Sequence, residues 1–65
     1  MNVVILKNFY EKNIHVDYID DERDPVWEEG KLTEIDEERN TITIDSEDTV
    51  LELAGESIQK VYLKE

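Results

Sequence analysis

The sequence predicts a mainly β fold, a small five-stranded barrel, and three observations support this prediction. Apolar and polar residues alternate in several short segments, of which Thr41-Ile42-Thr43-Ile44-Asp45 is the clearest. Clusters of turn-forming residues separate these segments. Gly30 permits the bend or bulge with which a strand curls into a barrel, and closing the sheet would remove most of its unpaired edge. We therefore expect one domain over residues 1–65, with the barrel over residues 13–64.

The first segment, residues 1–12, fits either a short helix or a first strand. Val3, Leu6 and Tyr10 could share one face of a helix with Asn2 as its N-cap, whereas Val3-Val4-Ile5 favours a strand. We favour the helix, because residues 8–13 contain no tight hairpin turn.

The remaining segments follow in order. Ile14, Val16 and Tyr18 alternate with polar residues as in a half-buried strand, and a polar loop follows over residues 20–25. The odd spacing of apolar residues in 31–36 predicts either a bulge or a change of the face that the strand buries, and Asn40 suits a left-handed turn position. Two further strands are expected near residues 50–53 and 58–63, joined by a short turn or one turn of 3₁₀-helix over 54–57.

The composition limits the environment of the chain. A chain of 65 residues can bury only a compact core, and the absence of cysteine excludes support from disulfides or thiolate-bound metals. No apolar stretch approaches the roughly 20 residues that span a membrane. We expect a cytoplasmic protein that is a monomer or a small homo-oligomer.

Charge is the strongest compositional feature. Eighteen acidic against seven basic residues give a net charge of −11, and residues 15–30 alone carry −6. Direct binding to nucleic acid is disfavoured because each phosphate contact would begin as repulsion, and anionic membranes are disfavoured for the same reason. The natural complement is a basic protein surface, most simply that of a nucleic-acid-binding protein.

The sequence offers little for catalysis, and we expect a protein that is not an enzyme and needs no cofactor. The single histidine, His15, would need Ser46 or Ser57 to build a triad, yet it alternates with Ile14 and Val16 and should face solvent. The paired carboxylates lie in stretches that read as loops or exposed ends. No acidic stretch has the spacing of a calcium-binding loop, so no specific metal site is predicted.

Trp27 has two interpretations. In a small barrel it is most simply a core residue, which we favour, but its acidic neighbours also suit an anchor for a partner. The segment 17–29 holds seven acids in thirteen positions. The candidate partner-binding residues are therefore Asp17, Asp20, Asp21, Glu22, Asp24, Trp27, Glu28 and Glu29.

The pattern over residues 13–64 resembles the C-terminal β segment of the YolD-like family. The resemblance rests on Ile14-His15-Val16-Asp17-Tyr18, Gly30-Lys31-Leu32 with Ile35-Asp36, Ile42-Thr43-Ile44, and the set Ile58, Val61 and Leu63. The same layout is similar to Src-homology-3-like and Sm-like small barrels, in which a glycine opens the second strand. The family's association with Y-family DNA polymerase genes implies a repair or phage context.

Two functional hypotheses follow. The first is an acidic inhibitor or adaptor that mimics DNA and covers the basic surface of a nuclease, a CRISPR effector, a restriction enzyme or a polymerase factor, with a phage anti-defence role as one setting. The second is a YolD-like accessory protein in DNA repair that acts through apolar contacts of Trp27 or an exposed strand edge.

Overall fold

The computed structural model describes residues 1–64, which form five strands and two short 3₁₀-helices. The helix η1 (Val3–Phe9) comes first. The strands are β1 (Asn13–Ile19), β2 (Pro25–Asp36), β3 (Thr41–Ser46), β4 (Thr49–Ala54) and, after the helix η2 (Gly55–Ser57), β5 (Ile58–Leu63). The predicted strands, the N-terminal helix and the turn before the last strand are confirmed. Within residues 1–64 neither helix has the length and apolarity needed to cross a membrane.

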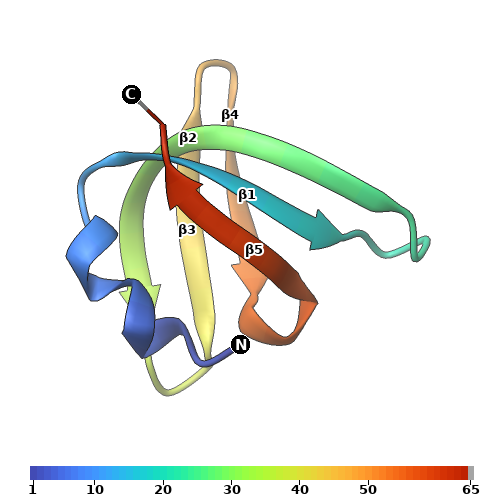
Figure 1. Ribbon diagram of the computed structural model, residues 1–65, viewed down its shortest axis with the longest axis horizontal. Coiled ribbons are helices and arrows are strands. Elements are labelled where there is room, and N and C mark those ends of the chain that lie inside the picture. Colours follow the sequence, from blue (N-terminus) through green and yellow to red (C-terminus); the bar gives the residue numbers. More distant parts are fainter. Residues whose placement is uncertain (65) are drawn as a thin grey trace.

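All five strands lie in one antiparallel sheet of order β4-β3-β2-β1-β5. The sheet is strongly curved, with η1 at one side of it beside the end of β2, and β4 and β5 are its two edge strands (Figure 1). The predicted closure into a barrel is wrong, because no ladder joins β4 to β5 in the described part of the chain. The three-residue η2 redirects the chain after β4, so that β5 pairs with β1 instead.

The core lies on the inner face of the curved sheet. Alternation within the strands places one side of each strand inward, as the fully buried Ile14 and Val16 of β1 show. The buried apolar residues are Val3, Leu6, Ile14, Val16, Leu32, Ile42, Ile44, Leu53 and Ile58. Trp27 is absent from this set and 61% exposed, so the favoured interpretation as a core residue is wrong.

Strand β2 is the longest element, and it changes partners along its length. Residues 25–31 pair with β1 and residues 31–36 pair with β3, with the predicted bulge between Leu32 and Glu34. Gly30 lies at this change of partner and has no positive φ. A Cβ at Gly30 would lie 2.6 Å from Ile44 Cγ2 and 2.7 Å from the Asp45 carbonyl oxygen. Glycine is therefore needed because β3 packs directly against the backbone of β2.

Asn40 joins three separated parts of the chain. It takes the predicted left-handed conformation, with φ of 55°, in the turn between β2 and β3. Its side-chain Oδ1 accepts from the backbone N–H of Val3, its Nδ2 donates to the Met1 carbonyl, and its own carbonyl accepts from Gly55 N–H. Asn2 caps η1, as predicted, by accepting from the N–H of Val4.

Candidate partner-binding surface

The loop between β1 and β2 carries four of the predicted partner-binding acids in an ordered turn. Asp20 Oδ1 accepts hydrogen bonds from the backbone N–H groups of Glu22 and Asp24, both at 2.9 Å. Backbone bonds between Asp20 and Asp24, and a left-handed Arg23, complete the turn. Asp21, Glu22 and Asp24 are exposed. The loop therefore presents its carboxylates from a fixed backbone, which lowers the entropy lost when a partner binds.

A second group of carboxylates surrounds an open hollow between β2 and the turn that joins β3 to β4. Trp27 and Gly30 contribute to its wall, and Lys64 is its one basic residue. Its acidic lining residues are Glu28, Glu29, Asp45, Glu47 and Asp48. Five carboxylates against one ammonium make the hollow anionic. Three predicted residues, Trp27, Glu28 and Glu29, belong to it.

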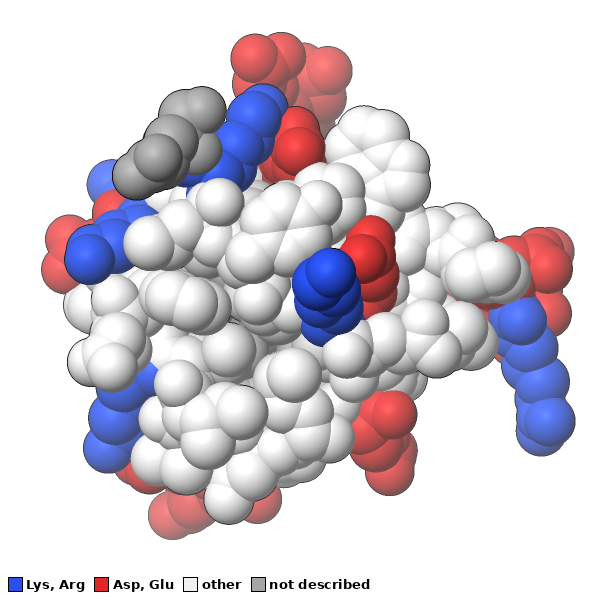
Figure 2. All heavy atoms as spheres, viewed as in Figure 1, with Lys and Arg blue, Asp and Glu red and all other residues white. Residues whose placement is uncertain are grey.

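The face seen in Figure 2 has a different character. Its Asp and Glu side chains lie mostly around the rim, and the middle is mostly uncharged (Figure 2). Large apolar side chains with substantial exposure in the whole chain include Ile5, Trp27, Val50 and Tyr62. An uncharged centre with a charged rim is the usual anatomy of a protein interface.

On the outer face of the sheet, three rings from three neighbouring strands form an aromatic stack, defined by Trp27, His15 and Tyr62. The imidazole of His15 is 5.3 Å from the Trp27 ring and 4.7 Å from the Tyr62 ring between centroids, with interplanar angles of 14° and 13°. The pairing register causes this arrangement: His15 lies opposite Glu29 and Tyr62, and its neighbour on the same face, Asp17, lies opposite Trp27. Because β1 runs between β2 and β5, His15 lies between the other two rings.

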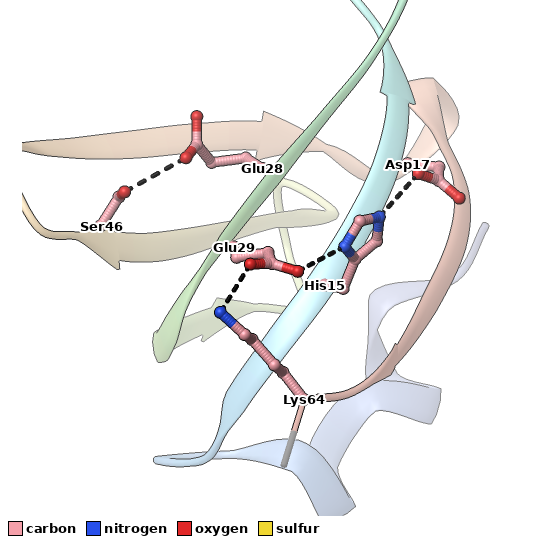
Figure 3. A network of polar contacts seen from close by, with 6 residues as sticks. All are labelled: His15, Asp17, Glu28, Glu29, Ser46 and Lys64. Atoms are coloured by element: carbon pink, nitrogen blue, oxygen red, sulfur yellow. Dashed lines mark hydrogen bonds and ion pairs between the residues drawn. The ribbon is translucent and has the colours of Figure 1, made fainter.

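His15 is also within hydrogen-bond distance of two carboxylates. Its Nδ1 is 2.8 Å from Glu29 Oε2 and its Nε2 is 2.9 Å from Asp17 Oδ1 (Figure 3). A carboxylate accepts only, so both bonds form together only when both ring nitrogens carry protons, that is, in the imidazolium. The bonds to Glu29 and then to Asp17 raise the pKa of His15 above its ordinary value.

The network continues from Glu29 to Lys64, the residue that follows β5. Glu29 Oε1 accepts from Lys64 Nζ at 2.7 Å, and the bonds from His15 and then Lys64 lower the pKa of Glu29. Glu28 turns to the other side of β2 and accepts from Ser46 Oγ at 3.1 Å (Figure 3). The adjacent glutamates, which both line the hollow, therefore have different partners: Glu28 binds Ser46 of β3, and Glu29 links His15 to Lys64.

The structure thus divides the eight predicted residues into three groups. Asp17, Trp27 and Glu29 meet around His15, whereas Asp20, Asp21, Glu22 and Asp24 form the loop, and Glu28 lies in the hollow. His15 points away from the core as predicted, but its side chain is only 14% exposed because two rings cover it. The sequence interpretation assigned no role to His15, although Tyr62 could be recognised as a half-exposed aromatic candidate similar to Trp27; the missed signal was the same-face spacing of His15 with Asp17 and of Trp27 with Glu29.

Within residues 1–64, no three histidine or acidic side chains are grouped so that they could hold a metal ion. Comparison with protein-family models, with curated proteins and with solved structures finds no match for this chain.

Proposed function

We propose that the protein is a non-catalytic acidic binding module that engages the basic surface of a nucleic-acid-binding protein, as a DNA-mimic inhibitor or an adaptor. The main support is the acidic hollow, in which five carboxylates and one lysine surround a concave surface. A protruding basic segment would be attracted into it and would offset the mutual repulsion of these acids.

The acidic loop supports the same proposal. Its carboxylates stand on a turn fixed by Asp20, so their spacing is set before binding, as the spacing of phosphates is set in a duplex. Basic side chains that normally bind phosphates would find ordered anions at the loop and the hollow. A nuclease, a CRISPR effector, a restriction enzyme or a polymerase factor is the class of partner, and such a partner implies the cytoplasm as the place of action.

For the fold, we propose a relation to the Src-homology-3-like and Sm-like small β proteins. Five antiparallel strands, a long second strand bent near its glycine and a 3₁₀ turn before the last strand support it.

The binding proposal is tested by competition and by matched charge removal. The immobilised protein should capture purified basic nucleic-acid-binding proteins at low salt and release them when duplex DNA or salt is added. The triple variant Asp21→Asn, Glu22→Gln, Asp24→Asn should capture less. The control triple Glu34→Gln, Glu38→Gln, Glu56→Gln removes the same charge from exposed positions elsewhere and should retain capture. Capture that is indifferent to salt, DNA and the loop variant would reject the proposal.

The exposure of Trp27 favours a second candidate, an accessory protein in DNA repair of the YolD-like kind that binds through apolar contacts. Trp27 and Tyr62 are 61% and 44% exposed on one face of the sheet. Under this alternative, Trp27→Ala should abolish capture and the loop triple should leave it intact. Loss of capture in the loop triple favours the acidic module, whatever the effect of Trp27→Ala.

A further inference from the structure

The aromatic stack and Lys60 together form a series in which positively charged groups alternate with aromatic rings. Lys60 Nζ lies over the Tyr62 ring, 5.5 Å from its centroid. Tyr62 stacks on His15, which donates to both carboxylates when it is protonated to imidazolium, and His15 stacks on Trp27. The order of contacts is ammonium, phenol ring, imidazolium, indole ring. Each cation lies against a π face, where the ring quadrupole attracts positive charge.

The alternation stops at Trp27, which is its most exposed ring. His15 covers one side of the indole, while 61% of the residue remains accessible. Tyr62 contacts Lys60 as well as His15, whereas within residues 1–64 the structure gives Trp27 no cation other than His15. Tryptophan is also the aromatic side chain that binds cations best. A positive group on the open side of Trp27 would complete the series.

Two carboxylates lie near Trp27 on the same face of the sheet. Asp17 lies opposite Trp27 in the register of β1 and β2, uses Oδ1 for His15 and keeps a side chain that is 40% exposed. Glu29 is less accessible at 30%, with one oxygen bonded to His15 and the other to Lys64. Trp27 itself lies on the wall of the acidic hollow. Asp17 is thus the carboxylate best placed to meet a cation that rests on Trp27.

We propose that Trp27 and Asp17 form a binding site for an arginine side chain of the basic partner, a site that rests on the proposed function and specifies it. A guanidinium is planar and stacks flat on an indole, and its N–H groups lie in its own plane, free to donate to a neighbouring carboxylate. A lysine ammonium is more strongly hydrated and offers a point charge without a stacking face. The site therefore distinguishes arginine from lysine at equal charge.

The test compares two peptides of identical length and charge, one rich in arginine and one rich in lysine, by calorimetry on the full chain. The arginine peptide should bind about three- to tenfold more tightly, from the cation–π contribution at a partly exposed site. In ¹H–¹⁵N spectra it should shift the single Trp27 indole N–H resonance and the backbone resonance of Asp17. Trp27→Leu should remove the preference for arginine, and Trp27→Phe should retain part of it.

Val50→Ala is the matched control, because Val50 is 65% exposed on β4, away from the aromatic stack, and its loss should leave the preference unchanged. Equal affinity for the two peptides, or spectral changes confined to residues 20–24, overturns the arginine site while the proposed function stands. Failure of both peptides to bind overturns both. Asp17→Asn gives an independent measurement: a preference for arginine that survives it unchanged also overturns the site.

Discussion

Replacing Gly30 by alanine should destabilise the protein substantially, although alanine is tolerated at most strand positions. The new Cβ would lie 2.6 Å from Ile44 Cγ2, 2.7 Å from the Asp45 carbonyl oxygen and 3.0 Å from the Asp45 carbonyl carbon. Two of these three atoms belong to the backbone of β3, so no change of side-chain rotamer relieves the overlap. Strand β3 must move away from β2, and it carries the buried Ile42 and Ile44 with it.

Overpacking of this kind costs about 1–3 kcal/mol. A chain of 65 residues has a total stability of about 3–10 kcal/mol, so the loss is a large fraction of it. At about 4–8 °C per kcal/mol, a loss of about 2 kcal/mol lowers Tm by about 8–16 °C. Urea and thermal unfolding followed by circular dichroism measure both quantities.

Two companion variants make the Gly30→Ala result specific. Lys31 is exposed and follows Gly30 in the strand, so the free energy of unfolding of Lys31→Ala should stay within about 0.5 kcal/mol of that of the unsubstituted protein. In an Ile44→Ala background the cost of Gly30→Ala should fall without vanishing, because the contact with the Asp45 carbonyl remains. If Gly30→Ala unfolds at the same urea concentration as Lys31→Ala, the close approach of β3 to β2 is not what this position requires.

Three further predictions concern the turn and the aromatic stack. The raised pKa of His15 stabilises the fold fully below pH 6.5, and this stabilisation is lost as the pH rises through the folded-state pKa. The lowered pKa of Glu29 stabilises the fold above pH 4.5, and this stabilisation is lost on acidification. The urea midpoint of unfolding should therefore be highest between pH 4.5 and 6.5, and His15→Gln should reduce its fall on the alkaline side. Asn40→Ala should lower the free energy of unfolding, measured in urea, by about 1–3 kcal/mol, because it removes two side-chain hydrogen bonds and alanine disfavours a φ of 55°. Asn40→Gly should recover the portion of this loss that comes from the backbone conformation. Trp27→Ala should shift the unfolding midpoint little, since the residue is 61% exposed, and a loss near that of a core truncation would contradict its placement.

The elements of the fold could be predicted from the sequence because their signals are local. The alternation of apolar and polar residues predicted β1 and β3, and the odd spacing in residues 31–36 indicated the bulge. Asn2 is a residue type common at helix N-caps, and Asn40 is one common at left-handed turn positions. Barrel closure could not be predicted in the same way. It depends on whether β4 and β5 meet, a relation between strand ends that no short sequence window contains.

The candidate site was predictable only in part, for the same reason. The acids of the loop between β1 and β2 are conspicuous in the sequence, and the structure adds the bonds of Asp20 that order them. The aromatic stack needs the register of three strands, in which His15 lies opposite Tyr62 and two positions from the partner of Trp27. Without that register, Trp27 could be assigned to the core on size alone, and His15 had no visible partners.

The contact between Trp27 and His15 gives the molecule a built-in optical reporter. The chain has one tryptophan and one histidine, and their rings are stacked. Indole emission is quenched by a protonated imidazole in contact with it, so the intrinsic fluorescence should brighten when His15 loses its proton. The same emission should change when a ligand covers the exposed side of the indole. An unlabelled sample excited at one wavelength would then report both the charge of the histidine and the occupancy of its neighbour.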